Sequence, residues 1–272
     1  MVFEIINEML TYNFMQRAFI SGIFIAIACS LLGTFLVLRR YALIGDGIAH
    51  ISFGGIALGL LFKINPFFSA LIFSLIGSIS IINIKEKLRL YGDTSIGIVS
   101  HASLGIGIFI ASAAQGFNVD IMSYLFGSIL VISYFEMIIS IILALVVILI
   151  IILFYNDLFA LTFDENTAKT LGINVNFLNY LLITLTAITI VNSMRIVGLL
   201  LASALIILPA ASSLMLKKNF KQSLFYSALF GLFSVLIGLL IAYFFDIAAS
   251  GSIVLTSTII FLIISLYKKI RI

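Results

Sequence analysis

Two side chains with the chemistry of metal ligands, Asp46 and His50, lie four residues apart in the sequence Gly-Asp-Gly-Ile-Ala-His. Four residues make about one helical turn, so both side chains point to one face, with Cβ atoms roughly 5–6 Å apart. A carboxylate and an imidazole suit Zn²⁺, Mn²⁺ or Fe²⁺. The residues alone also allow a hydrogen-bonded pair or a helix cap. Because ionisable groups are costly at membrane depth, the apolar setting favours the metal site, on the path of a transported ion.

The composition places this pair in a membrane protein. Of the 272 residues, 63% are hydrophobic and only 10% are charged, whereas soluble domains carry roughly 25% charged residues. A soluble fold of this size must keep a wetted exterior and cannot bury so much apolar surface. Most of that surface therefore faces lipid. The excess of 15 basic over 11 acidic residues then indicates membrane topology rather than nucleic-acid binding.

Apolar runs between polar stretches predict an all-α, polytopic bundle of about nine spans, with eight to ten allowed by the length. A further apolar piece, Ile121–Ile132, is too short to span and is predicted to be re-entrant or interfacial. The predicted spans are Phe14–Leu38, Gly47–Phe62, Pro66–Ile84, Ile96–Ala114, Tyr134–Tyr155, Asn179–Val197, Leu199–Leu216, Leu224–Phe245 and Gly251–Tyr267.

Basic residues cluster at four places that these spans put on one side of the membrane. Two, four and two predicted spans separate consecutive clusters, and every interval is even. The positive-inside rule makes this side the cytoplasm. The same count places the loop 156–178 and the C-terminus inside and the N-terminus outside. The clusters are Arg39-Arg40, Lys85/Lys87/Arg89, Lys217/Lys218/Lys221 and Lys268/Lys269/Arg271.

The longest polar stretch, residues 156–178, is predicted to contain a short helix. Acidic residues at its start suit the positive end of the helix dipole, and Gly172 suits its end. Ala168 and Leu171 are expected to share a face, since they are three residues apart. The helix is either an ordinary connector or a docking site for a partner protein. The P-loop dipeptide Gly-Lys is absent, so an ATPase would be a separate polypeptide. The candidate docking residues are Asp164, Glu165, Ala168, Leu171 and Gly172.

Other unusual residues inside the spans have plainer interpretations. His101, the only other histidine, is expected to be buried and hydrogen-bonded, with a second ligand or ion relay as the alternative. Snorkelling to the interface explains Arg195, with a role as an electrostatic guard or interface residue as the alternative. Pro209 is expected to kink or break its helix, as in the discontinuous helices of transporters. The single cysteine, Cys29, excludes an internal disulfide.

Four longer motifs carry a family resemblance over about residues 14–267. Residues 38–50 read LRRYALIGDGIAH and fit the pattern LRR-x-x-L-x-G-D-x-x-x-H. Residues 125–131 (LFGSILV) fit LFG-x-IL, and residues 168–172 (AKTLG) fit a short coupling segment. Residues 197–211 resemble VG-x-LL-x-x-ALLI-x-PAA. Together they resemble the permeases of ATP-binding cassette (ABC) importers of zinc, manganese or iron.

The resemblance implies one transmembrane permease domain over residues 1–272, of the type II ABC importer kind, in the bacterial cytoplasmic (inner) membrane. It implies a homodimer with its pore near the subunit interface, embedded in membrane lipid. Cytoplasmic ABC ATPases would dock around 164–172, and an extracytoplasmic metal-binding protein would deliver the ion. Asp46 and His50 match metal-pathway positions. Asp246 would otherwise be a solvated span end, but it matches a pathway aspartate.

The implied cargo is a divalent Mn, Zn or Fe ion, with no permanent cofactor, and the chain is not itself an enzyme. Two rival transporter classes remain. A proton- or sodium-coupled secondary transporter would use Asp46, His50 and His101 as an ion relay, but such proteins often show inverted repeats and none is evident here. A cobalamin or iron-chelate permease would need a wide cavity without direct ligands, which the pair argues against.

Overall fold

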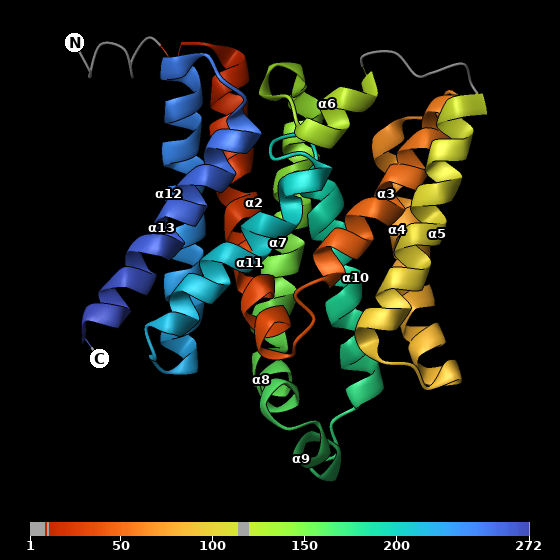
Figure 1. Cartoon of the computed structure of the whole chain (residues 1–272), viewed down its shortest axis with the longest axis vertical. Coiled ribbons are helices and arrows are strands. Elements are labelled where there is room, and N and C mark those ends of the chain that lie inside the picture. Colours follow the sequence, from red (N-terminus) through yellow and green to blue (C-terminus); the bar gives the residue numbers. More distant parts are fainter. Residues whose placement is uncertain (1–8, 10, 114–119, 272) are drawn as a thin grey trace.

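The computed structural model describes residue 9 and residues 11–113 and 120–271, and these form a helical bundle (Figure 1). Eight of the helices are long and apolar enough to cross a membrane, and α11 is slightly shorter at 17 residues. The expectation of about nine spans is confirmed. The elements are α2 (Asn13–Leu38), α3 (Ile44–Leu61), α4 (Pro66–Leu88), α5 (Gly92–Ala113), α6 (Asp120–Phe126), η1 (Ile129–Val131), α7 (Tyr134–Leu153), α8 (Tyr155–Phe163), α9 (Glu165–Thr170), α10 (Val175–Ser193), α11 (Leu199–Met215), α12 (Phe220–Phe245) and α13 (Ala249–Arg271).

Polar side chains fix where several helices begin. Asn65 accepts a 3.0 Å hydrogen bond from the backbone amide of Phe67, and Pro66 occupies the first turn of α4. Ser133 and Glu136 form a reciprocal capping box at the start of α7. Such side chains satisfy amides that have no partner within the helix. Short polar connections therefore separate long apolar helices.

Helix boundaries differ from the predicted ones around the α10–α11 junction. The span predicted as Asn179–Val197 begins at Val175 and ends at Ser193. The helical interruption lies at residues 194–198, whereas α11 continues through Pro209. The backbone is therefore broken before α11, and Pro209, which was expected to kink or break its helix, does not break it.

The short segment predicted at Ile121–Ile132 forms α6 and η1, which pack on this break. The backbone amide of Ser128 donates a 2.9 Å hydrogen bond to the carbonyl of Arg195. Gly127 and Gly198 both have positive φ, at 76° and 79°. A Cβ atom on Gly198 would lie 2.5 Å from the carbonyl oxygen of Leu125. Glycine thus satisfies both the backbone conformation and the close approach.

Arg195 ties the same junction to α6 and α7. Its side chain is only 14% exposed and lies 2.7 Å from the Glu136 carboxylate. It also donates a 2.9 Å hydrogen bond to the Tyr124 hydroxyl, and its guanidinium lies 4.2 Å from the Tyr124 ring centroid. The snorkelling interpretation is therefore wrong for Arg195, because the charge is neutralised inside the protein.

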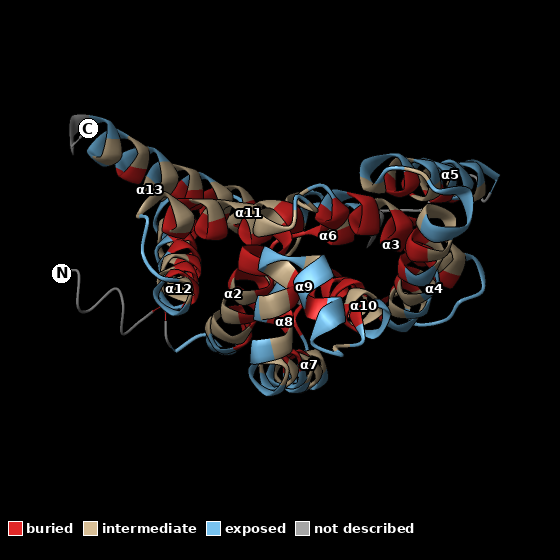
Figure 2. Cartoon of the chain, turned by 90° about the horizontal axis from the view of Figure 1, so that it is seen from below, coloured by how far each residue is buried: buried red, intermediate tan, exposed pale blue. Residues whose placement is uncertain are grey.

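Burial varies strongly between helices (Figure 2). Helices α2, α3 and α10 contribute much of the core, and Cys29 is fully buried there. Helices α5, α7 and α13 bury less than a third of their most apolar windows. Seen from below, α13, α11, α3 and α5 follow one edge of the molecule. These helices leave apolar surface for lipid or for another subunit.

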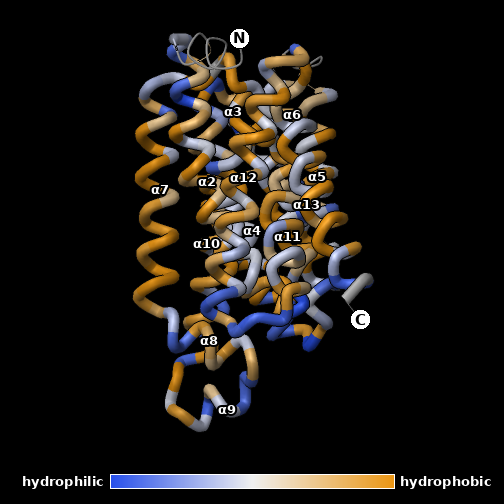
Figure 3. The backbone as a smooth tube through the Cα atoms, turned by 90° about the vertical axis from the view of Figure 1, so that its left-hand side faces the viewer, coloured by the Kyte–Doolittle hydropathy of each residue, from blue (hydrophilic) through white to orange (hydrophobic). Residues whose placement is uncertain are grey.

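Hydrophilic residues gather at the end of the bundle that carries α8 and α9 (Figure 3). The C-terminal ends of α2, α4, α11 and α13, which contain or directly precede the basic clusters, lie toward this same end (Figure 1). That placement agrees with the even span counts between the clusters.

Candidate metal site

Asp46 and His50 both lie on α3, one turn apart, as their spacing predicts. Asp46 is in the first turn, where the helix dipole favours a negative charge. Most of α3 is buried, yet Asp46 is exposed and His50 is partly exposed. The two side chains therefore lie on the part of α3 that the rest of the chain leaves open.

Two glycines bring neighbouring helices close to Asp46. A Cβ atom on Gly45 would lie 3.1 Å from Cβ of Ser203 on α11. On Gly47 it would lie 2.5 Å from a methyl group of Ile96 on α5. The small residues allow close helix approach, so the Gly-Asp-Gly sequence lets α11 and α5 pack on either side of the carboxylate.

Ser203 fixes the Asp46 carboxylate. Its hydroxyl donates a 2.6 Å hydrogen bond to Oδ1 of Asp46, and Ser203 itself is buried. A donor on one carboxylate oxygen orients the group and leaves the other oxygen for a ligand. Sequence reasoning missed Ser203. The only available signal was its place within the motif at residues 197–211.

His101 on α5 faces His50, with ring centroids 6.4 Å apart. Nδ1 of His101 lies 2.7 Å from the carbonyl oxygen of Gly97. A carbonyl oxygen can only accept a hydrogen bond, so Nδ1 is the donor, and in a neutral imidazole the lone pair is then on Nε2. His101 is hydrogen-bonded, as expected, but it is exposed rather than buried. Its free nitrogen has the chemistry of a metal ligand.

Asp246 lies in a different place, as the cap of α12 with φ of 51°. It lines a pocket of about 460 Å³ together with Gly127, Ser128 and Tyr243. Within the described part of the chain, no three His, Cys, Asp or Glu side chains form a group that could hold a metal ion. The structure thus brings Asp46, Ser203 and two histidines to one region, and Asp246 to another.

The polar stretch 156–178 contains most of α8, the whole of α9 and the start of α10, with Asp164 between α8 and α9. Asp164 accepts a 2.9 Å hydrogen bond from the amide of Asn166. Hydrogen bonds from the Thr167 hydroxyl and from the amides of Asn166 and Thr167 hold the pKa of Asp164 below its ordinary value. Gly172 ends the turn with φ of 78°, as its sequence position predicts.

Ala168 and Leu171, which are expected to share a face, differ strongly in burial. Ala168 is completely buried, whereas Leu171 lies just after α9 and is 68% exposed. Leu171 still donates its backbone amide to the carbonyl of Thr167 at 3.1 Å, so the difference lies in what covers each side chain. Leu171 is therefore available to an external partner, and Ala168 is not.

Arg39 connects this stretch to the segment that precedes Asp46. It donates a 2.7 Å hydrogen bond to Asn179 on α10 and lies 3.6 Å from Glu165 on α9. The side chain is only 7% exposed. Burial lowers the pKa of Arg39 below its ordinary value, while Tyr41 and Glu165 oppose that shift. A buried arginine thus joins α9, α10 and the turn between α2 and α3.

Comparison with known proteins gives one family. The family model described as the ABC 3 transport family matches residues 11–268. The manganese import system permease protein ScaB of Streptococcus gordonii is 37% identical over 97% of this chain and 94% of its own length. The high-affinity zinc uptake system membrane protein ZnuB of Haemophilus influenzae is 31% identical, over 96% of this chain and 99% of its own length.

A solved structure has the same fold. PsaBC from Streptococcus pneumoniae, in complex with an Fab, superposes with a TM-score of 0.86 at 36% identity. The match covers 97% of this chain and 95% of that one. The similarity therefore extends over nearly the whole bundle.

Proposed function

The chain belongs to the ABC 3 transport family, and from this premise we propose that it forms the membrane pathway of an ATP-driven importer of divalent metal ions. It is a multi-pass membrane permease and not by itself an enzyme. Family membership favours ATP-driven import over the secondary-transporter alternative. The hydrolysis of ATP would belong to separate ATPase subunits.

The observation that carries the proposal is the Asp46 carboxylate, which Ser203 holds on an open part of α3 beside His50 and His101. Carboxylate and imidazole are ligands for divalent transition metals. The described residues of one chain supply too few converging ligands for a closed site. We propose that a second copy contributes the same residues and completes a weak site. A transported ion must leave again, so a weak site is an advantage.

The same donors suit manganese and zinc, the metals in the names of the relatives. We propose one of these as the cargo, with iron as a further candidate. Zinc would bind more tightly to almost any such site by the Irving–Williams order. Binding affinity alone therefore cannot identify the transported ion, which has to be identified by measuring uptake.

Coupling to ATP hydrolysis would begin at α9, with Leu171 exposed to receive a cytoplasmic ATPase. Displacement of α9 would act through Glu165 and Arg39 on the turn between α2 and α3. Asp46 lies seven residues after Arg39, so the turn can change access to the site. The outer pocket at Asp246 would receive the ion from a metal-binding delivery protein.

Uptake in vesicles tests this function. The chain is reconstituted with its ATPase and its delivery protein, and radiolabelled Mn²⁺ and Zn²⁺ are supplied separately, with and without ATP. We expect uptake of one ion that depends strictly on ATP. Uptake driven by a proton gradient without ATP would contradict the proposal.

A further inference from the structure

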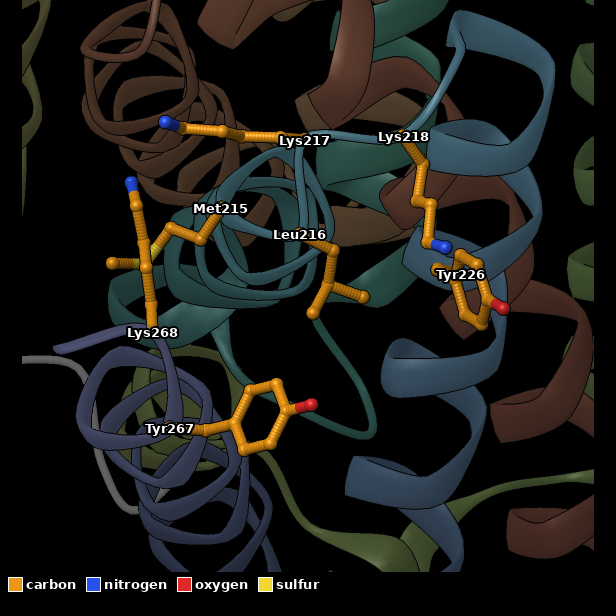
Figure 4. Close-up of a pocket in the computed structure, with 7 residues that line it drawn as sticks. All are labelled: Met215, Leu216, Lys217, Lys218, Tyr226, Tyr267 and Lys268. Carbon is orange, nitrogen blue, oxygen red and sulfur yellow. The ribbon is translucent and has the colours of Figure 1, made fainter. Parts of the chain in front are cut away.

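A pocket of about 450 Å³ opens between the end of α11 and helices α12 and α13, apart from the metal site (Figure 4). It lies toward the end of the bundle that carries α9 (Figure 1). Three lysines and two tyrosines dominate its walls. The lining residues are Met215, Leu216, Lys217, Lys218, Tyr226, Tyr267 and Lys268.

The pocket is strongly basic. None of its lining residues is acidic, and no ion pair joins Lys217, Lys218 or Lys268 to another residue in the described part of the chain. Lys218 extends toward Tyr226, while Lys217 and Lys268 extend to the other side of the view (Figure 4). Lysine side chains are flexible, with three rotatable donors each. They can therefore close on an anion that enters between them.

A second, apolar pocket of about 270 Å³ lies between the same two helices, α12 and α13. It has no polar side chain in its lining, and several of its residues are exposed. An exposed apolar groove between membrane helices suits a hydrocarbon chain. The lining residues are Phe230, Phe233, Ile237, Ile260, Ile263 and Ile264.

Helical spacing places the two pockets one after the other along α12 and α13. Phe230 follows Tyr226 by four residues on α12, and Ile264 precedes Lys268 by four on α13. Residues four apart lie on one face, one above the other. The strip from Tyr226 to Ile237 spans 11 steps, or about 16 Å at 1.5 Å per residue. That is about half of the roughly 30 Å hydrocarbon core, the depth of one leaflet.

We propose that this combined surface is a binding site for an anionic phospholipid. The phosphate of the headgroup lies among Lys217, Lys218 and Lys268, and an acyl chain follows the groove between α12 and α13. Basic pockets between transmembrane helices are suited to acidic headgroups. A free phosphate ion could bind the lysines, but it would make no contact with the apolar groove. The proposal is independent of the metal that the permease carries.

Native mass spectrometry of the assembled complex tests the site. The complex is incubated in detergent with phosphatidylglycerol or phosphatidylcholine, and the retained lipid is counted. We expect phosphatidylglycerol to be retained at least about tenfold more than phosphatidylcholine, since its headgroup has a net negative charge for the lysines, whereas the quaternary ammonium of phosphatidylcholine offsets its phosphate. The combined variant Lys217→Gln, Lys218→Gln and Lys268→Gln should lose this preference.

A matched variant removes the same charge outside the pocket. Lys87→Gln, Lys221→Gln and Lys269→Gln alter three exposed lysines near the same end of the bundle, and the preference should persist. Equal loss in both variants, or retention in the pocket variant, would overturn the site. Complete displacement of the lipid by millimolar inorganic phosphate would also overturn it, by indicating a simple anion site. None of these readouts depends on metal transport.

Discussion

The hydroxyl of Ser203 on α11 donates a 2.6 Å hydrogen bond to the carboxylate of Asp46 on α3, across 157 positions of sequence. This contact exists because Gly45 allows α11 to approach α3 beside the carboxylate. It means that the orientation of a candidate metal ligand depends on a second helix. A movement of α11 relative to α3 would therefore change the ligand itself.

Ser203→Ala should weaken metal uptake without disturbing assembly. Loss of a hydrogen bond to a ligating group typically costs 10–100-fold in metal affinity or activity, and we expect about tenfold in the transport KM. Ser212→Ala is the control, because Ser212 is buried on the same helix and donates to the backbone carbonyl of Leu208 there. Equal uptake by the Ser203 variant and the wild type would remove Ser203 from the site.

Asp46→Ala and His50→Ala should each abolish uptake and leave dimer assembly and ATPase docking intact. Both side chains are on the open part of α3, so their truncation leaves no cavity in the core. Uptake of radiolabelled ion measures transport, and size-exclusion chromatography of the complex measures assembly and ATPase docking. Normal transport by both variants would defeat the site assignment.

Arg39→Gln should uncouple ATP hydrolysis from transport. The variant loses the charge that faces Glu165 and weakens the contact to Asn179. ATPase activity of the complex should continue while metal uptake falls at least about tenfold, the scale of one lost charged hydrogen bond. The neighbouring Arg40 is exposed, and Arg40→Gln should leave both rates unchanged. Equal effects of the two substitutions would argue against the proposed connection.

Gly198→Ala should destabilise the protein more than Gly172→Ala does. Both positions have positive φ, so both substitutions strain the backbone by roughly 1–2 kcal/mol. Only Gly198 is crowded, by α6, whereas Gly172 has open space. Overpacking adds about 1–3 kcal/mol. Thermal unfolding in detergent measures the difference, and similar melting temperatures would show that the contact of α6 with the break does not restrict residue size.

Protection of the α9 amides should depend on pH through Asp164. Its pKa is lower in the folded state than the value of about 3.9 in an unfolded chain. The stabilisation is therefore fully present above that unfolded value and is lost as the pH falls through the folded pKa. Hydrogen exchange at Asn166 and Thr167, corrected for intrinsic rates, should be constant from about pH 5 to 8 and faster in strong acid. Asp164→Ala should be fast throughout, unlike Asp157→Ala; unchanged protection in Asp164→Ala would refute the cap.

Local sequence was sufficient to predict the spans and the pairing of Asp46 with His50. Long apolar runs must be helical in lipid, because every backbone group needs a partner within the segment. The spacing of four residues then fixes a shared face. Helix α8 was predicted only as part of a polar loop, although Leu158 and Leu161 carry a helical spacing and are both buried.

Tertiary contacts explain what the sequence could not indicate. From its position in the sequence, Arg195 resembles a snorkelling residue. Only the packed structure shows that Glu136 on α7 lies beside it. The break before α11 is set by Gly127 and Gly198, which meet across 71 positions, and not by Pro209. No local sequence pattern predicts such pairings, because the two residues of each pair lie far apart in the chain and each is compatible with its own segment without the other.

Cys29 is the only thiol of the chain, and it is completely enclosed within the core on α2. Reagents dissolved in water or in lipid cannot reach it while the helices stay together. Thiol-reactive spectroscopic labels should therefore not react with the unmodified protein while it is folded. A label attached through an introduced cysteine then reports on that position alone. Labelling of Cys29 itself would indicate that the helices around it have separated.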